Sequence, residues 1–337
     1  MHAIVLVGGF GTRLRPLTAN TPKSMLTVGN EPIVARLMRR LEAGGVTTVT
    51  LALGFLPEPF VAAFPTGRVG AVELRYAVEP EPLDTAGAIR FAAAAAGVDE
   101  TFLVLNGDVI TDLDVAGLMR EHQLLGAEAT LHLTPVAEPS AYGVVERDNA
   151  GRVRRFVEKP APGETTSHVV NAGTYVMERS VLDLIPDGRR VSVERETFPV
   201  LVDRGGLFGV VTDDYWIDVG RPDTFLRANL DRLAGRYDAS LPVVTALGIE
   251  SGARIESGAH VLDSVVAGHA RIGAGSRVDH SVVLAGAQIG QDVVMRHSIV
   301  MGHVGAGAVL DRAVVGSAGV VEPGRQVIDE RVPAHHG

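Results

Sequence analysis

The sequence has 337 residues, 46% of them hydrophobic, and a formal net charge of −9 at pH 7. This length exceeds one compact core, so we expect one large domain with an appendage, or two domains. The absence of cysteine excludes disulfides, thiolate metal sites and a cysteine nucleophile. Dispersed basic residues argue against nucleic-acid binding. With neither an apolar run of membrane-spanning length nor a signal-peptide pattern, we expect a soluble cytoplasmic protein that does not bind membranes.

From residue 3 to about 235, β-branched runs alternate with helical patterns. Buried strands are predicted at 3–7, 47–53, 73–78, 102–108 and 129–136, and helices at 31–45, 84–98 and 114–127. Such alternation builds a mainly parallel sheet with helices on both faces. We therefore expect an α/β fold, a three-layer α/β/α domain, over residues 1–235.

The sequence pattern changes after the polar segment 236–247, which we expect to be a linker. Aliphatic residues recur about every six positions, and Ser264, Ser281 and Ser298 are spaced seventeen residues apart. A repeat of this size predicts a solenoid whose coils share one apolar core. Over residues 248–331 the pattern resembles the hexapeptide-repeat left-handed parallel β-helix, although the spacing slips in the later coils. We interpret it as an assembly or regulatory module that stacks only on itself, leaving the sheet domain to fold without it.

The first predicted strand leads into "GGFGTRLRP" at residues 8–16. Its glycines let backbone amides approach and cradle a phosphate chain. The P-loop pattern is absent, and the Rossmann fingerprint would need glycine or alanine where Leu14 stands. A plain glycine turn with two solvated arginines is the alternative.

The longer stretch "GGFGTRLRPLTANTPKSM" closely resembles the signature loop of the sugar-1-phosphate nucleotidylyltransferases, or NDP-sugar pyrophosphorylases. Further motifs follow in order: "EPLDTAGAI", "LNGDV", "YGVV", "VEKP", "NAGTYV" and "YWIDVG". Among subfamilies the chain is most similar to the mannose-1-phosphate guanylyltransferases. The resemblance implies a Rossmann-like nucleotidyltransferase domain that transfers a nucleoside monophosphate from a triphosphate, GTP foremost, to a sugar 1-phosphate, mannose 1-phosphate foremost. It also implies a homo-oligomer, a dimer or a tetramer.

The resemblance assigns residues to the reaction. A phosphate nucleophile is already ionised at pH 7, because its second pKa is about 6, so the chemistry needs converging cations rather than a general base. The implied catalytic residues are Arg13, Lys23 and Asp108, with Asp108 and Asp218 holding Mg²⁺. The implied nucleotide-binding residues are Leu6, Gly8, Gly9, Gly11, Thr12, Arg13, Glu79, Asp84, Thr85, Asn106 and Gly107. The implied sugar-phosphate residues are Gly143, Glu158, Lys159, Asn171 and Gly173.

One position departs from the family pattern, because Asp84 stands where relatives carry glycine. Its carboxylate could accept the N1–H and N2–H donors of guanine, and Glu79 favours guanine for the same reason. Equally, Asp84 could cap the helix that begins at Thr85. The same chemistry with dTTP, UTP or ATP and glucose 1-phosphate, or with a sugar-like cyclitol 1-phosphate, therefore stays open.

Two other functions remain as alternatives. A silent regulatory subunit would have lost phosphate or metal residues, yet Arg13, Lys23, Asp108 and Asp218 are all present. An acyltransferase would need a histidine base in the solenoid. We expect the solenoid histidines to be solvent-facing or corner residues; they are His260, His269, His280, His297 and His303.

Overall fold

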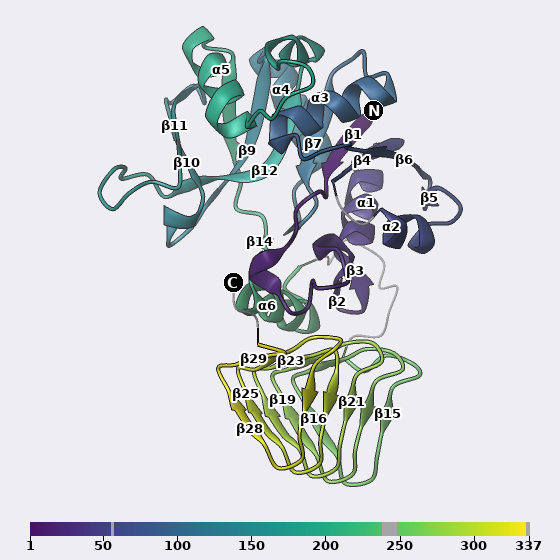
Figure 1. The fold of residues 1–337 in the computed structure, drawn as a ribbon. Coiled ribbons are helices and arrows are strands. Elements are labelled where there is room, and N and C mark those ends of the chain that lie inside the picture. The colour runs from purple at the N-terminus through teal and green to yellow at the C-terminus, as the bar shows by residue number, and fades with distance from the viewer. Residues whose placement is uncertain (55–56, 238–247, 335–337) are drawn as a thin grey trace. The chain divides into compact units, whose positions relative to one another are not determined.

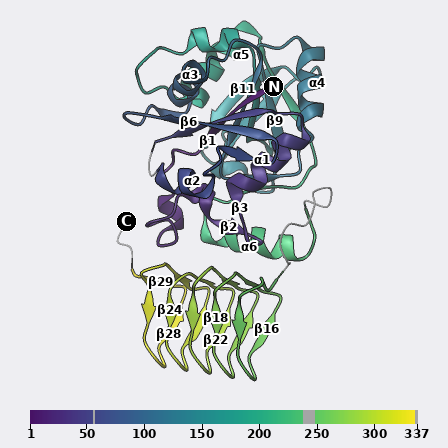
Figure 2. The same cartoon turned by 90° about the vertical axis from the view of Figure 1, so that its right-hand side faces the viewer.

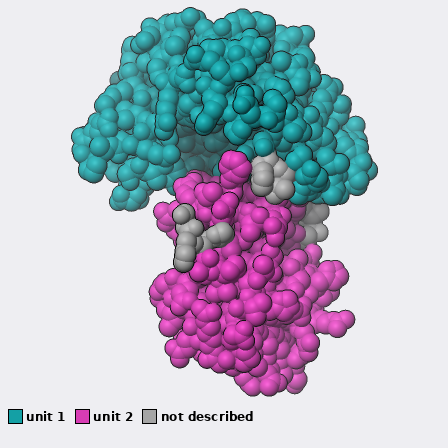
Figure 3. All heavy atoms as spheres, viewed as in Figure 1, with its two compact units in different colours: residues 1–9, 37–216 teal, residues 10–36, 217–337 magenta. Residues whose placement is uncertain are grey.

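The computed structural model describes residues 1–54, 57–237 and 248–334. The chain divides into two compact units: residues 1–9 with 37–216 form unit 1, and residues 10–36 with 217–337 form unit 2 (Figure 3). Most of the predicted linker, from 238 onward, lies outside the described residues. Within the described ranges, no helix is long and apolar enough to cross a membrane.

Unit 1 is built on a ten-stranded sheet of order β11-β10-β12-β7-β1-β4-β6-β5, with β9 and β13 extending it from β12 (Figure 1). Its parallel centre contains β1 (His2–Leu6), β4 (Thr48–Leu53), β6 (Val72–Val78) and β7 (Phe102–Asn106). The other strands are β5 (Arg68–Val69), β9 (Ala129–Pro135), β10 (Gly143–Arg147), β11 (Val153–Glu158), β12 (Val169–Met177) and β13 (Leu207–Val211). Strand β12 runs antiparallel to β7. The predicted mainly parallel sheet is confirmed at the centre.

Helices cover this sheet; those near 31–45, 84–98 and 114–127 were predicted, whereas those at 58–63 and 198–204 were not. They are α1 (Ile33–Ala43), α2 (Glu58–Ala63), α3 (Asp84–Ala96), α4 (Val115–Leu125) and α5 (Phe198–Arg204), with one π-helical turn, η5 (Val193–Thr197). Short 3-10 turns lie at η3 (Pro139–Ala141) and η4 (Arg179–Leu184). The alanines of α3 are small enough to pack closely on β1, β4 and β6, and Ala86, Ala92 and Ala93 are buried in the core.

Unit 2 holds the phosphate-loop segment from Phe10 onward, a helix that follows residue 217 and the solenoid. Its first part contains η1 (Thr12–Leu14), η2 (Lys23–Met25), β2 (Thr27–Val28) and β3 (Glu31–Pro32), and α6 (Pro222–Leu233) follows later in the chain. Two short strands, β8 (Val109–Thr111) in unit 1 and β14 (Trp216–Asp218) at the unit boundary, complete the non-solenoid part.

The solenoid is a β-helix of three parallel sheets with five strands each (Figure 2). The first sheet contains β15 (Arg254–Ile255), β18 (Arg271–Ile272), β21 (Gln288–Ile289), β24 (His303–Val304) and β27 (Val320–Val321). The second contains β16 (His260–Leu262), β19 (Arg277–Asp279), β22 (Val294–Arg296), β25 (Val309–Asp311) and β28 (Gln326–Ile328). The third, here named the β17 sheet, contains β17 (Val265–Val266), β20 (Val282–Val283), β23 (Ile299–Val300), β26 (Val314–Val315) and β29 (Arg331–Val332). The predicted β-helix is confirmed.

The repeated serines join successive coils. Ser264, Ser281 and Ser298 are buried, and each hydroxyl donates to the carbonyl two residues earlier. Each hydroxyl also accepts an amide of the next coil, at 3.0–3.1 Å. After Ser298 that amide is Ala313, fifteen residues on, which locates the slip in spacing. The serines therefore satisfy buried backbone amides at one corner of the coil.

The β17 sheet is not bare. Inward residues such as Val266 belong to the solenoid core, so their strand neighbours point outward. Four of these outward residues are nevertheless at most 7% exposed; they are Val265, Val282, Ile299 and Val314. Helix α6 contacts β17 and, through Leu226 and Leu230, lines a cavity of about 530 Å³ with Ile299 and Val314. The expectation that the solenoid stacks only on itself is therefore wrong.

Candidate functional site

In unit 1, strands β1 and β7 end at one edge of the sheet, where Leu6 pairs with Asn106. The Gly107 amide donates to the Leu6 carbonyl at 2.9 Å. A Cβ on Gly107 would lie 2.4 Å from Val7 Cγ1, so a side chain does not fit in this turn. The turn presents the half-buried Asp108 at the carboxyl edge of the strands, where open α/β sheets bind their ligands.

The predicted nucleobase residues lie beside the same edge. A Cβ on Gly8 would lie 3.1 Å from the Gly54 nitrogen and 3.6 Å from Glu79 Oε1, so bare backbone passes close to that carboxylate. Glu79 Oε2 accepts a 2.9 Å hydrogen bond from the Leu83 amide. Burial raises the pKa of Glu79, and the negative charge of Asp84 raises it further, whereas the hydrogen bond from Leu83 lowers it. The two carboxylates therefore share one environment. Gly9 is exposed, with open space where a Cβ would lie.

Asp84 is the first residue of α3 and adopts the left-handed conformation, with φ of 60°. Its Oδ1 accepts from the adjacent Thr85 amide at 2.8 Å, whereas a capping side chain accepts from the second or third helical amide. The Thr85 hydroxyl instead secures this end of the helix, donating to Glu194 Oε2 and accepting from the Val193 amide, both at 2.8 Å. The Asp84 carboxylate stays exposed at the surface.

The predicted sugar-phosphate residues of β10 and β11 lie side by side. Gly143 pairs with Glu158, and a Cβ on Gly143 would lie 2.6 Å from Phe156 and 3.0 Å from Glu158 Oε2. The Lys159 ammonium is 3.3 Å from Glu158 Oε1 and 61% exposed. Bare backbone, a carboxylate and an exposed cation thus meet at this strand end, a set suited to sugar hydroxyls and a phosphate.

Strand β12 uses the side chain of Asn171 internally. Its Nδ2 donates to the Tyr175 hydroxyl at 2.9 Å, and its Oδ1 accepts from the Gly173 amide at 3.0 Å. Gly173 has φ of 77°, and a Cβ there would lie 2.6 Å from Asn106 Nδ2. Asn106 therefore lies where a side chain on Gly173 would stand, and Asn171 hydrogen-bonds within its own strand.

Two polar residues here were not predicted from the sequence. Tyr175 is fully buried, and burial raises the pKa of its phenol, with further rises from the charges of Glu194, Glu158 and Asp108. Glu194 lies on the π-helical turn and also accepts from the Ser192 hydroxyl at 2.8 Å. The sequence "SVERETF" carries no periodic or motif signal that marks Glu194, because its partner Thr85 is 109 residues away.

In unit 2 the phosphate loop folds back on itself. Gly11 has φ of 58°, and a Cβ there would meet Thr18 at 3.1 Å and Lys23 at 3.3 Å. The Thr18 hydroxyl donates to the Gly11 carbonyl at 2.7 Å. Thr12 and Arg13, both exposed, follow on the turn η1.

Two cations and a carboxylate gather around Gly220. Arg13 Nη2 and Asp218 Oδ1 each lie 2.8 Å from the point where a Gly220 Cβ would stand. The Lys23 ammonium is 3.5 Å from Asp218 Oδ1, and these two side chains are 11% and 23% exposed. Unit 2 thus contains Arg13, Lys23 and Asp218, together with Gly11 and Thr12. All other predicted site residues belong to unit 1.

The donor chemistry fits a hard cation. Asp108 and Asp218 each offer carboxylate oxygens, the ligands that Mg²⁺ prefers, and Mg²⁺ usually takes one or two carboxylates and completes its shell with water and substrate phosphates. Over the described ranges, no group of three or more histidine, cysteine, aspartate or glutamate side chains could hold a metal ion.

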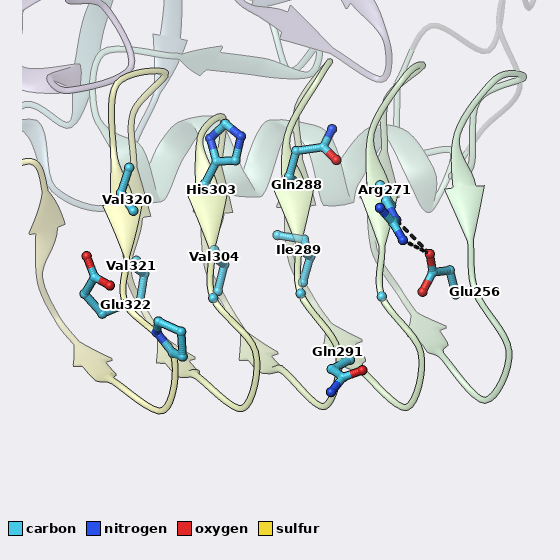
Figure 4. Close-up of a pocket in the computed structure, with 14 residues that line it drawn as sticks. Glu256, Arg271, Gln288, Ile289, Gln291, His303, Val304, Val320, Val321 and Glu322 are labelled. Carbon is cyan, nitrogen blue, oxygen red and sulfur yellow. Dashed lines mark hydrogen bonds and ion pairs between the residues drawn. The ribbon is translucent and has the colours of Figure 1, made fainter.

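The solenoid histidines do not form a second site of this kind. His269, His280 and His297 adopt the left-handed conformation of corner residues, as expected, and the rings of His280 and His297 lie 5.5 Å apart. His303 lines a shallow cavity of about 390 Å³ on the first sheet with valine and glutamine side chains, at a distance along the sheet from the Arg271–Glu256 pair (Figure 4). Among the described residues, no side chain hydrogen-bonds or ion-pairs with His303. His280, by contrast, pairs through Nδ1 with Asp279 Oδ1 at 2.7 Å.

Comparison with known proteins gives two family matches. The nucleotidyl transferase family matches residues 2–235, and the GlmU-like C-terminal hexapeptide family matches residues 244–332. The chain is 42% identical to the mannose-1-phosphate guanylyltransferase of Mycobacterium tuberculosis over 70% of this chain and 65% of that protein. It is 40% identical to the mannose-1-phosphate guanyltransferase of Kluyveromyces lactis over 72% of this chain and 68% of that protein. The first curated relatives are thus matched over less than two thirds of their length.

A solved structure also matches. The crystal structure of HddC from Yersinia pseudotuberculosis, complexed with GMP-PN, has a TM-score of 0.59 and 27% identity, covering 68% of this chain and 97% of that chain.

Proposed function

Because the chain belongs to the nucleotidyl transferase family, we propose that it transfers guanosine monophosphate from GTP to a sugar 1-phosphate, mannose 1-phosphate foremost, and releases pyrophosphate. The observation that carries the proposal is the cluster of Arg13, Lys23 and Asp218 around Gly220. We also propose the cytoplasm as its location and a homo-oligomer, a dimer or a tetramer, as its assembly.

The reaction needs two anions to meet. An oxygen of the sugar phosphate attacks the α-phosphorus of the triphosphate in line with the departing pyrophosphate, and no base is needed because that oxygen is already ionised. The Arg13 guanidinium offers a planar fork to phosphate oxygens as charge builds on the leaving group, and Lys23 offers a compact charge. Asp108 and Asp218 would hold Mg²⁺, which would supply neutralisation of phosphate charge.

Substrate recognition is assigned to unit 1. Asp84 and Glu79 are two carboxylates with interacting charges, and guanine presents two adjacent donors on its N1–N2 edge, whereas thymine and uracil alternate acceptor and donor. Glu158 would accept sugar hydroxyls and Lys159 would pair with the sugar phosphate. The relatives with guanyltransferase names and the GMP-PN complex of HddC support the choice of guanine.

The test is a matrix of pyrophosphate-release assays. GTP, ATP, UTP, CTP and dTTP are each combined with mannose 1-phosphate, glucose 1-phosphate and a cyclitol 1-phosphate, with Mg²⁺ present, and the Arg13→Ala variant is the matched negative control. We expect the highest kcat/KM for GTP with mannose 1-phosphate. A higher value for dTTP with glucose 1-phosphate would contradict the guanylyl assignment, and a higher value for GTP with the cyclitol phosphate would contradict the mannose assignment.

A further inference from the structure

The outward column of the β17 sheet ends in an unexpected residue. Its first four positions are aliphatic and buried, but the fifth, in the last coil, is Arg331. A long cationic side chain at the end of an apolar column packs its aliphatic part on that column and needs a polar environment for its charged end. The Arg331 guanidinium finds one outside the solenoid, donating from Nη1 to the carbonyl of Arg15 at 3.0 Å.

A second contact lies beside the first. Gly316 directly follows β26, and a Cβ on it would lie 2.7 Å from both Cβ and the carbonyl oxygen of Pro16. Pro16 is buried. Most crowded glycines of the solenoid face their own coils or flexible side chains, whereas Gly316 faces the backbone of the phosphate loop. Two late coils of the β-helix thus hold two consecutive residues of that loop.

The held residues are directly connected to Arg13. The Arg15 amide donates to the Thr12 carbonyl at 3.2 Å, and the Leu14 amide donates to the Gly11 carbonyl at 2.9 Å. Arg13 lies at the middle of this short turn, η1. The turn is only three residues long, so a shift of Arg15 or Pro16 moves the backbone that carries the Arg13 side chain.

We propose that Arg331 and Gly316 are positioning residues for the phosphate loop, so that the end of the β-helix sets the orientation of Arg13 toward the nucleotide. The inference rests on the proposed function, because it takes Arg13 to contact the triphosphate. Neither residue is proposed to contact substrate. Arg331 fixes the loop by a hydrogen bond to its backbone, and Gly316 fixes it by leaving room for Pro16.

The experiment measures steady-state kinetics and thermal stability of the full chain. Arg331→Ala is expected to raise the KM for GTP roughly 3- to 10-fold, the value of one hydrogen bond, while the KM for mannose 1-phosphate and the Tm stay near those of the wild type. Arg331→Lys keeps a donor and should recover part of the loss. Gly316→Ala, which displaces backbone rather than removing a donor, should lower kcat as well, because Arg13 is misplaced in the transition state.

Two control variants match these changes in type. Arg325→Ala removes an exposed arginine of the last coils that pairs with Glu330 at 2.9 Å. Gly268→Ala places a methyl beside the flexible carboxylate of Glu250, 3.1 Å away. Both should retain wild-type kinetics. The inference is overturned if Arg331→Ala and Gly316→Ala behave like these controls. It is also overturned if these variants raise the KM values of both substrates equally and lower the Tm. If Arg13→Ala is also silent, the proposed role of the loop fails instead.

Discussion

Replacing Asp84 by glycine separates nucleobase recognition from helix stability. Asp84 adopts φ of 60°, a conformation that costs a non-glycine residue about 1–2 kcal/mol and glycine almost nothing. The substitution also removes the hydrogen bond from the Thr85 amide, worth about 0.5–1.5 kcal/mol. The two effects nearly cancel, so we expect the free energy of unfolding to change by less than about 1 kcal/mol.

The kinetic effect should be much larger and confined to one nucleotide. Loss of a charged acceptor for the guanine donors costs about 1.5–3 kcal/mol, or roughly 10- to 100-fold in kcat/KM for GTP. ATP, UTP and dTTP have no matching donor pair, so their values should stay constant. Asp84→Asn is the matched control: asparagine tolerates the left-handed conformation but loses one acceptor, so it should share the GTP defect.

The assay is competition among equal concentrations of GTP, ATP, UTP and dTTP, with thermal unfolding measured on the same samples. A lower Tm with all nucleotides affected alike would contradict a role for Asp84 in guanine recognition and favour its interpretation as a helix cap.

Three further predictions concern other parts of the chain. Asp108→Asn and Asp218→Asn should each abolish Mg²⁺-dependent turnover without a change in Tm; near-native turnover in either would contradict the metal assignment. Arg13→Ala should lower kcat by about 100-fold or more, whereas Lys159→Ala should raise the KM of the sugar phosphate above all, and the reverse pattern would mean that their roles are exchanged. Burial lowers the pKa of His132 from 6.5 to about 4, so the unfolded state takes up a proton first as the pH falls, and up to about 3 kcal/mol of stability should be lost between pH 6.5 and 4. Denaturant unfolding of His132→Leu should show a flatter pH dependence than the wild type; equal slopes would contradict this.

The central strands and the solenoid could be predicted because their patterns are local. Strands such as β1 and β4 are buried on both faces and read as apolar runs, and the solenoid repeats its spacing coil by coil. Strand β11 was not predicted, since it lies at the sheet edge and exposes Arg154 and Arg155 within its six residues. Polar residues at an exposed edge hide the alternation on which strand prediction depends.

The candidate site divides in the same way. The loop carrying Arg13 and Lys23 was identified from one continuous motif. Thr85 contacts Glu194, which is 109 positions away in the sequence. Arg331 contacts Arg15, which is 316 positions away. Such contacts depend on how the elements pack, and no local pattern in the sequence predicts them.

An isotope experiment shows whether an oxygen of the sugar phosphate attacks the α-phosphorus of GTP. The protein is incubated with GTP, Mg²⁺ and mannose 1-phosphate labelled with ¹⁸O at its non-bridging phosphate oxygens. The masses of the products are then measured by mass spectrometry. We expect GDP-mannose that keeps all of the label and pyrophosphate that carries none. Label in the pyrophosphate, or pyrophosphate release without a labelled nucleotide sugar, would contradict it.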